Sequence, residues 1–190
     1  QTNLKRMLAY SSIAHSGYAL VGVIAAGLQG THGAGSSGVV FYVFAYCIMT
    51  LGSFAFVSIL EKREDSSVSV NDLQGVARRH PYLALGMTIF LLSLAGIPPL
   101  VGFFGKFFIF TAAIKQGLIW LSVWGVINSV ISVYYYLRPV VLMYMSDEEG
   151  VAVMPRAVNT KMTILVSAFL IVVIGLGSDS FFKLVQSSVG

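Results

Sequence analysis

The chain has 190 residues, of which 56% are hydrophobic and only 11% charged, and its formal net charge is +4. Soluble domains contain roughly 25% charged residues, so this composition, with a mean hydropathy of +0.82, excludes an ordinary water-soluble domain and predicts a membrane protein. The positive charge does not indicate a nucleic-acid partner, because no basic patch is interleaved with aromatic residues.

Hydropathy predicts an all-α, polytopic membrane protein in which residues 1–190 form a single membrane domain. Five apolar segments read as transmembrane helices, and about 20 residues suffice to cross a hydrocarbon core of ~30 Å. They cover about residues 7–28, 39–60, 82–114, 118–145 and 162–176. A glycine-rich connection over 30–38 and polar connections over 61–80 and 146–161 separate some of them, and an interfacial helical turn is expected after Gly177.

The distribution of basic residues predicts an orientation. With five spans, the N-terminus and the two polar connections share one face. Nine basic residues lie on that face and two on the other: Lys5, Arg6, Lys62, Arg63, Arg78, Arg79, Arg138, Arg156 and Lys161 against Lys115 and Lys183. The positive-inside rule then places Gln1 in the cytoplasm and Gly190 on the outer, periplasmic face of what we expect to be a bacterial inner membrane. Because Gln1 precedes an apolar run closely and is not a methionine, we also expect a fragment of a longer chain.

The third segment combines an expected helix break with a single embedded charge. Pro98 and Pro99 lie in its middle beside Gly96, and Lys106 is the one charge between Leu83 and Phe110. Proline removes a backbone donor and clashes with the preceding turn, so the helix should break here, although a simple kink is the alternative. Broken helices with ionisable residues at membrane depth are typical of ion or proton pathways.

Lys106 is the main candidate for a proton carrier. A lysine at the centre of a membrane helix costs about 2.5–3.5 kcal/mol on insertion scales, and burial disfavours the charged form of an amine. We therefore expect an amine that accepts and releases a proton near neutral pH. The alternative is a side chain that extends along its helix to the membrane surface.

Polar residues recur at helical spacing inside three of the predicted helices, so each set shares one helix face. The sets are Ser11, Ser12, His15 and Tyr18; Tyr42, Tyr46, Thr50 and Ser53; and Ser122, Gly125, Ser129, Ser132 and Tyr136, with Asn128 alongside. Hydrogen bonding between helices is the simple interpretation, but several such faces around an embedded lysine also predict a hydrated interior. His15 is the second candidate for proton relay, and a structural role is its alternative.

Other features indicate no catalytic, metal or cofactor site on this chain. Cys47 is the only cysteine, which excludes an internal disulfide and cysteine-ligated clusters, and we expect it to be a small buried residue. No metal-ligand spacing links His32 and His80. Residues 33–38 spell G-x-G-x-x-G but follow an apolar helix and lack an acidic residue about 20 positions later, so a flexible loop is predicted instead of a nucleotide site.

Tyr134, Tyr135 and Tyr136 precede Arg138 closely. Amphipathic aromatic rings beside a long cationic side chain are typical of the membrane–water interface. The sequence therefore predicts an interfacial aromatic cluster at this point of the fourth helix.

Three long motifs carry a family resemblance. They are LKRMLAYSSIAHSGY (Leu4–Tyr18), RRHPYLALGMTIFLLSLAGIPPLVGFFGKFFIF (Arg78–Phe110) and SVISVYYYLRPVVLMY (Ser129–Tyr144). Together they resemble the antiporter-like membrane subunits of respiratory complex I, and most closely the subunit N group of bacterial NADH–quinone oxidoreductase, the counterpart of mitochondrial subunit 2. The resemblance covers nearly the whole chain.

This resemblance implies that the chain is the C-terminal five helices of a longer subunit built from two inverted repeats. Lys106 would be the proton-carrying lysine of the second half-channel, and His15 would lie on the hydrophilic axis between half-channels. The chain itself would carry no cofactor; NADH, FMN, iron–sulfur clusters and quinone would belong to partner subunits. Its partners would be the other membrane subunits of complex I and the lipid bilayer.

Two alternatives to a redox-driven proton-translocating subunit stay open on the sequence. Multisubunit sodium/proton antiporter complexes share the break and the lysine, although the tyrosine triplet with Arg138 favours the complex I subunit. The third possibility is a structural membrane scaffold in which Lys106 is paired and inert.

Overall fold

The computed structural model describes residues 1–29, 34–61, 68–146 and 158–189. The predictions for His32, Gly33, Lys62, Arg63 and Arg156 lie outside these residues. The regular elements, in chain order, are α1 (Leu4–Gln29), α2 (Ala34–Leu60), the 3₁₀ helix η1 (Val70–Leu73), α3 (Val76–Arg79), α4 (Pro81–Ala95), α5 (Val101–Lys115), α6 (Ile119–Met145), α7 (Val158–Leu176) and α8 (Ser178–Val189). The predicted all-α membrane fold is confirmed.

Five crossings of a bilayer follow from the helix lengths. Helices α1, α2, α6 and α7 are each long and apolar enough to span a membrane. Helices α4 and α5 have 15 residues each, about 22 Å at ~1.5 Å per residue, which is less than the ~30 Å of a hydrocarbon core. Neither spans alone, so the two together make the fifth crossing, which is broken at residues 96–100.

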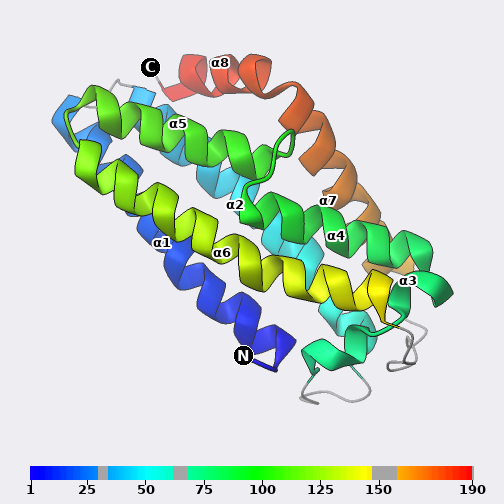
Figure 1. The fold of residues 1–190 in the computed structure, drawn as a ribbon. Helices are drawn as coiled ribbons and strands as arrows, with labels where there is room; N and C mark the ends of the chain where they lie inside the picture. Colours follow the sequence, from blue (N-terminus) through cyan, green and yellow to red (C-terminus); the bar gives the residue numbers. More distant parts are fainter. Residues whose placement is uncertain (30–33, 62–67, 147–157, 190) are drawn as a thin grey trace.

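Helix α2 occupies the centre of the bundle, where it packs against α1, α4, α5, α7 and α8. Figure 1 shows α4 and α5 following one another across the bundle, with a loop between them and α6 running alongside. The N-terminus, η1 and α3 gather at one end of the bundle, and α8 lies at the other. Helix α4 therefore stops, and α5 begins, partway along the bundle.

Backbone contacts and one ion pair stabilise the end of the bundle near Gln1. Asn3 and Ser69 form an isolated β-bridge, and the Leu4 amide donates to the Val68 carbonyl at 2.8 Å. Lys5 forms an ion pair with Glu61. Residues 68–80 of the expected polar connection thus contain short helices and pack on the bundle, a feature that hydropathy did not predict.

Helix α8 is longer than the single interfacial turn that was expected. Its aromatic side chains pack on α2 and α5. The Phe182 ring stacks on that of Phe108 with centroids 4.0 Å apart, and the Phe181 ring stacks on that of Phe44. Because Asp179 and Lys183 stay exposed and paired, α8 is amphipathic and suited to the membrane interface.

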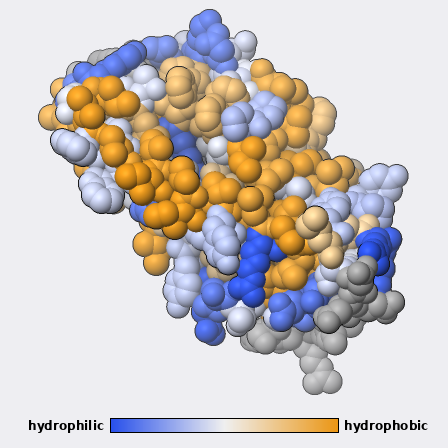
Figure 2. Space-filling model, in the orientation of Figure 1, coloured by the Kyte–Doolittle hydropathy of each residue, from blue (hydrophilic) through white to orange (hydrophobic). Residues whose placement is uncertain are grey.

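The surface carries many large exposed apolar side chains. Figure 2 shows hydrophobic residues across the middle of the visible face and hydrophilic residues towards both ends, as expected for a belt against lipid. Cys47 is exposed, so its prediction as a buried residue is wrong. Tyr134 is exposed, but Tyr136 is fully buried, so the interfacial cluster predicted for the three tyrosines is wrong for Tyr136.

The expectation of a flexible glycine-rich loop is also wrong for residues 34–38, which begin α2. A Cβ atom on Gly35 would lie 2.7 Å from the Ala26 amide nitrogen. Glycine is needed here because the backbones of α1 and α2 approach one another closely. The same residues that suggested flexibility therefore serve tight helix packing.

We predict that Gly35→Ala destabilises the subunit by about 1–3 kcal/mol, because a backbone atom cannot move aside for the new methyl group. The matched control is Gly27→Ala, whose Cβ meets nothing within 4 Å and which should be neutral or stabilising by ~0.5–1 kcal/mol. The melting temperatures of the two purified variants measure the difference. Equal melting temperatures would contradict the close packing of α1 on α2.

Candidate functional site

The site is built on the way in which α4 ends. Gly96 adopts the left-handed conformation with φ of 86°, and the amides of Gly96 and Ile97 donate back to the Leu92 and Ser93 carbonyls at 3.0–3.1 Å. The last four carbonyls of a helix have no partner within it. This turn satisfies the carbonyls of Leu92 and Ser93 and leaves those of Leu94 and Ala95 pointing beyond the helix end.

Lys106 occupies those two carbonyls. Its Nζ donates to the Leu94 oxygen at 3.0 Å and to the Ala95 oxygen at 3.1 Å, and the residue is only 5% exposed. The side chain folds back from α5 onto α4 and does not extend to the surface. A cation at a helix C-terminus is stabilised by the partial negative charge there. The end of α4 therefore supplies the acceptors for the Lys106 amine, and the amine supplies the donors for that helix end.

Glycine permits the close approach of the two half-helices. A Cβ on Gly96 would lie 3.1 Å from Lys106 Nζ, and a Cβ on Gly102 would lie 1.9 Å from the Ser93 carbonyl oxygen. The Gly102 amide donates to Ser93 Oγ at 3.1 Å. The start of α5 is therefore pressed directly against the end of α4, which brings Lys106 within reach of the carbonyls.

The two prolines of the predicted break have a different place. Pro98 and Pro99 are exposed in the connection between the half-helices, and the peptide bond between them is cis. The carbonyl of Pro99 lies against α7, where a Cβ on Gly175 would approach it to 2.4 Å. Of the predicted break residues, Gly96 contacts Lys106, whereas the prolines shape the connection.

Two further helices complete the surroundings of Lys106. The amine donates to Ser129 Oγ on α6 at 2.9 Å and lies over the ring of Tyr18 on α1, 5.1 Å from its centroid. Ser129 and Tyr18 belong to the polar faces seen in the sequence but were not singled out as site residues. Helical spacing was the signal that could have found them.

His15 is the centre of a second buried cluster. Its Nδ1 is 2.6 Å from the Tyr42 hydroxyl and its Nε2 is 3.0 Å from the Tyr136 hydroxyl, while its ring stacks on Tyr46 with centroids 4.7 Å apart. The residue is 2% exposed. A neutral imidazole donates from one nitrogen and accepts at the other, and a tyrosine hydroxyl can do either. The hydrogen bonds can therefore run in either direction through this cluster.

Tyr18 lies between the two clusters. Its ring meets the His15 ring edge-on, with centroids 5.8 Å apart, and its face is turned to the Lys106 amine. The structure thus brings the two predicted titratable residues to the same region of the bundle, separated by one aromatic ring.

The charge of Lys106 faces dipoles and not a carboxylate. Within the described part of the chain, the acidic residues are Glu61, Asp72 and Asp179, all at helix ends or outside the spanning helices. The same described residues contain no group of three or more histidines, cysteines or acids that could hold a metal ion. The arrangement suits the transfer of a proton better than the binding of a metal.

Comparison with known proteins gives the family. The sequence model described as NADH:quinone oxidoreductase/Mrp antiporter, TM, matches residues 1–132. The chain is 53% identical over all its 190 residues to NADH-quinone oxidoreductase subunit N of Bdellovibrio bacteriovorus, covering 39% of that relative. It is 48% identical over 149 residues, or 78% of the chain and 30% of the relative, to subunit N of Trichlorobacter lovleyi. The chain therefore spans less than half the length of the curated relatives it matches.

Solved structures share the fold. A chain of respiratory complex I from Thermus thermophilus with bound aureothin matches with a TM-score of 0.80 and 30% identity, over 96% of this chain and 40% of that one. A chain of the Mrp complex from a Dietzia species matches with a TM-score of 0.81 but 19% identity, over 100% of this chain and 42% of that one, which supports the fold alone. The matched family model and the identity to full-length relatives agree, and the chain belongs to the NADH:quinone oxidoreductase/Mrp antiporter family of membrane proteins.

Proposed function

We propose that this chain is part of a proton-translocating membrane subunit of an NADH–quinone oxidoreductase, in which Lys106 carries the proton. The observation that supports this most is the buried Lys106 amine on the free carbonyls of Leu94 and Ala95, at the break between α4 and α5. The relatives named NADH-quinone oxidoreductase subunit N support the assignment to that enzyme.

Two opposing influences suit Lys106 to this role. The carbonyls and the Ser129 hydroxyl accept hydrogen bonds from its ammonium form, whereas burial favours the neutral amine. A unit charge that arrives at, or leaves, a point 10 Å from the amine changes the free-energy difference between its charged and neutral forms. The change is about 1.7 kcal/mol at an effective dielectric constant of ~20. That is more than a tenfold change in the protonation equilibrium, since ~1.36 kcal/mol corresponds to tenfold. Charge movement elsewhere in the complex could thus load and unload Lys106.

His15 is proposed as the relay beside this carrier. Both of its ring nitrogens already contact hydroxyl groups, so a proton that arrives on one nitrogen can be matched by release from the other. The alternative is a structural role, in which His15 only links α1 to α2 and α6. Because this role uses the same hydrogen bonds, an experiment is needed to distinguish it from proton relay.

The remaining assignments concern the whole enzyme. We propose that the chain moves protons without exchanging electrons, and that NADH, FMN, iron–sulfur clusters and quinone are held by partner subunits. The complex would lie in a bacterial inner membrane, with Gln1 on the cytoplasmic side and the C-terminus on the periplasmic side, as the bias of basic residues indicates.

A sodium/proton antiporter subunit is the second candidate, because the description of the matched family includes Mrp antiporters. Two observations favour the oxidoreductase. The similarity to the Mrp complex is limited to 19% identity, and the lysine amine occupies the carbonyl oxygens that an unwound helix could otherwise offer to Na⁺. Sodium-dependent transport without dependence on quinone would favour the antiporter instead.

We predict that Lys106→Ala in the assembled complex lowers the number of protons pumped per NADH oxidised several-fold. Lys106→Arg should do the same, because a guanidinium keeps its charge and cannot release the proton. Lys115→Ala is the matched control, since Lys115 lies exposed at the end of the same helix. Proton uptake and NADH oxidation are measured together in sealed vesicles.

The outcomes separate the hypotheses. Full pumping by Lys106→Ala would refute the carrier role and favour a structural scaffold. Full pumping by Lys106→Arg with loss in Lys106→Ala would mean that only the positive charge is required, which contradicts proton release from this residue.

For His15, the informative change is His15→Gln. A glutamine amide can still donate to one tyrosine hydroxyl and accept from the other, but it does not titrate, so assembly should persist while pumping falls several-fold. His80→Gln, at the exposed start of α4, is the control. Normal pumping by His15→Gln would show that the histidine only anchors the helices.

A further inference from the structure

The serines of α6 differ in how their hydroxyl groups are bonded. Ser122 Oγ donates to the Leu118 carbonyl at 3.1 Å, and Ser132 Oγ donates to the Ser129 carbonyl at 2.6 Å. Such bonds to the preceding turn are a common arrangement for serine inside a helix. Within the described residues, the one hydrogen bond of Ser129 Oγ is the bond that it accepts from Lys106 Nζ at 2.9 Å. The hydroxyl hydrogen of Ser129 is therefore not committed to its own helix.

The partners of the Lys106 amine differ in what they can offer. An ammonium group has three N–H donors, which match the carbonyls of Leu94 and Ala95 and the hydroxyl of Ser129. The face of the Tyr18 ring, 5.1 Å away, also favours the cation. A carbonyl only accepts hydrogen bonds, whereas a hydroxyl both accepts and donates them. Of these four partners, the hydroxyl is the one that can bond to either protonation state.

Loss of a proton changes what the amine needs. The neutral amine keeps two N–H bonds, which match the two carbonyls at the end of α4, and it gains a lone pair. A buried acceptor without a partner is costly. The Ser129 oxygen already lies at hydrogen-bond distance from Nζ, and the hydrogen of a serine hydroxyl rotates to suit its partner. Rotation alone therefore supplies a donor to the lone pair.

We infer that Ser129 is a positioning residue for Lys106, whose hydroxyl accepts a hydrogen bond from the ammonium form and, after rotation, donates one to the neutral amine. The inference rests on the proposed function, because it concerns how the proton carrier is held in each of its two forms. The proton that is gained or lost resides on Nζ, and the O–H bond of the serine changes direction without breaking. Neutral Lys106 thus stays on the Leu94 and Ala95 carbonyls, where it can be protonated again.

The titratable groups around the amine leave this task to the serine. Helix α1 faces it with the ring of Tyr18 and, behind that ring, with His15. Helix α2 places Tyr42 beside the start of α5, α4 contributes the two carbonyls, and α7 carries Lys161 in its first turn. Within the described residues, none of these side chains forms a hydrogen bond with the amine. Removal of the serine hydroxyl therefore acts directly on Lys106.

Two substitutions of similar volume separate the hydroxyl from the packing at this position. Ser129→Thr keeps a hydroxyl, and Ser129→Val replaces it with a methyl group. In the full-length subunit of the assembled complex, proton pumping is measured in sealed vesicles as a function of pH. Ser129→Thr should pump as the wild type does. In Ser129→Val, the neutral amine loses its donor, so maximal pumping should fall roughly two- to tenfold.

The pH profile of Ser129→Val should also move, and in a defined direction. Hydrogen bonds to charged groups are stronger than those between neutral groups, so the ammonium form loses more than the neutral amine does. Lys106 then requires a higher proton concentration to become protonated. The profile should shift to lower pH by about one unit, and a purely structural role of the serine would leave its position unchanged.

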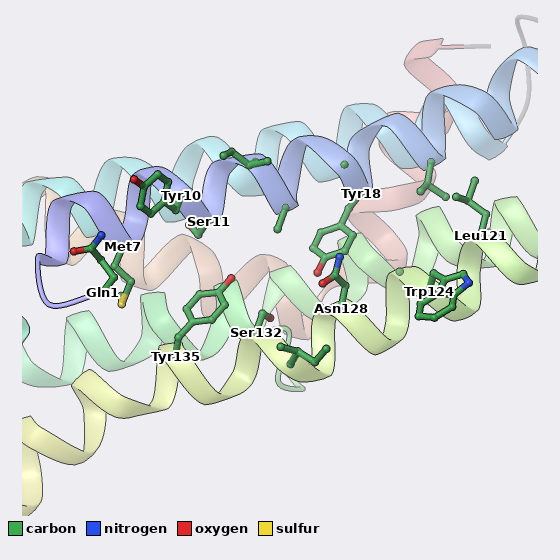
Figure 3. Close-up of a pocket in the computed structure, with 16 residues that line it drawn as sticks. Gln1, Met7, Tyr10, Ser11, Tyr18, Leu121, Trp124, Asn128, Ser132 and Tyr135 are labelled. Carbon is green, nitrogen blue, oxygen red and sulfur yellow. The ribbon is translucent and has the colours of Figure 1, made fainter.

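Ser132→Ala is the matched control. Figure 3 shows Ser132 on the same helix, where it lines the groove between α1 and α6, and its hydroxyl donates within α6. Its pumping rate and pH profile should match the wild type. A wild-type rate and profile in Ser129→Val would overturn the inference. Equal losses in Ser129→Thr and Ser129→Val, or an equal loss in Ser132→Ala, would overturn it too, because the effect would not belong to the hydroxyl on Lys106.

Infrared difference spectroscopy with ¹³C-labelled serine observes the rotation in the unaltered chain. The C–O stretching band of a serine depends on whether its hydroxyl accepts or donates a hydrogen bond. An isotope-sensitive serine band should change during NADH oxidation in the wild type and be missing from the difference spectrum of Ser129→Thr, which pumps but has no serine at this position. A wild-type difference spectrum without such a band, or the same band in Ser129→Thr, would overturn the inference.

The two proposals fail in different ways. If Lys106→Ala pumps normally, the proposed function fails whatever the Ser129 variants do. If Lys106→Ala abolishes pumping but Ser129→Val behaves as the wild type does, Lys106 remains the carrier and Ser129 is not its positioning residue.

Discussion

The structure depends on one interaction, the contact of a lysine amine with the free carbonyls at the end of a helix that stops inside the bundle. An interrupted helix exposes polar backbone groups that lipid cannot satisfy. Here the turn at Gly96 satisfies two carbonyls and Lys106 satisfies the carbonyls of Leu94 and Ala95. The buried amine in turn finds acceptors without a carboxylate among the described residues. The amine offsets the cost of the unpaired carbonyls at the helix end, and these carbonyls offset the cost of burying the amine. This explains why the broken helix and the lysine occur together.

The surrounding packing keeps this contact in place and connects it to the cluster around His15. Gly102 brings α5 against α4, and a Cβ on Gly105, the residue before Lys106, would lie 2.8 Å from the ring of Tyr42. The same Tyr42 contacts His15 through its hydroxyl. Gly102 and Gly105 therefore set the distance between Lys106 and the histidine cluster, and the central position of α2 connects both to the rest of the bundle.

Much of this could be predicted from the sequence, for identifiable reasons. The break, the embedded lysine and the polar helix faces are local patterns in which proline, glycine and helical spacing have direct consequences. The sequence did not reveal which carbonyls Lys106 would contact, because this depends on the turn at Gly96 and on a fold-back between two helices. It misplaced Cys47 and Tyr136 because the side of a helix that faces lipid cannot be read from hydrophobicity when both sides are apolar. The early start of α2 was missed because glycine in close helix packing has the same composition signal as glycine in a loop.

The central claim is that the Lys106 amine changes its protonation during turnover while it remains buried at the break. Infrared difference spectroscopy on the full complex, with lysine side chains labelled with ¹⁵N, compares the resting enzyme with the enzyme during NADH oxidation. The account predicts an isotope-sensitive ammonium band that changes in intensity in the wild type and is missing from the difference spectrum of Lys106→Met. Identical difference spectra for the two proteins would contradict it.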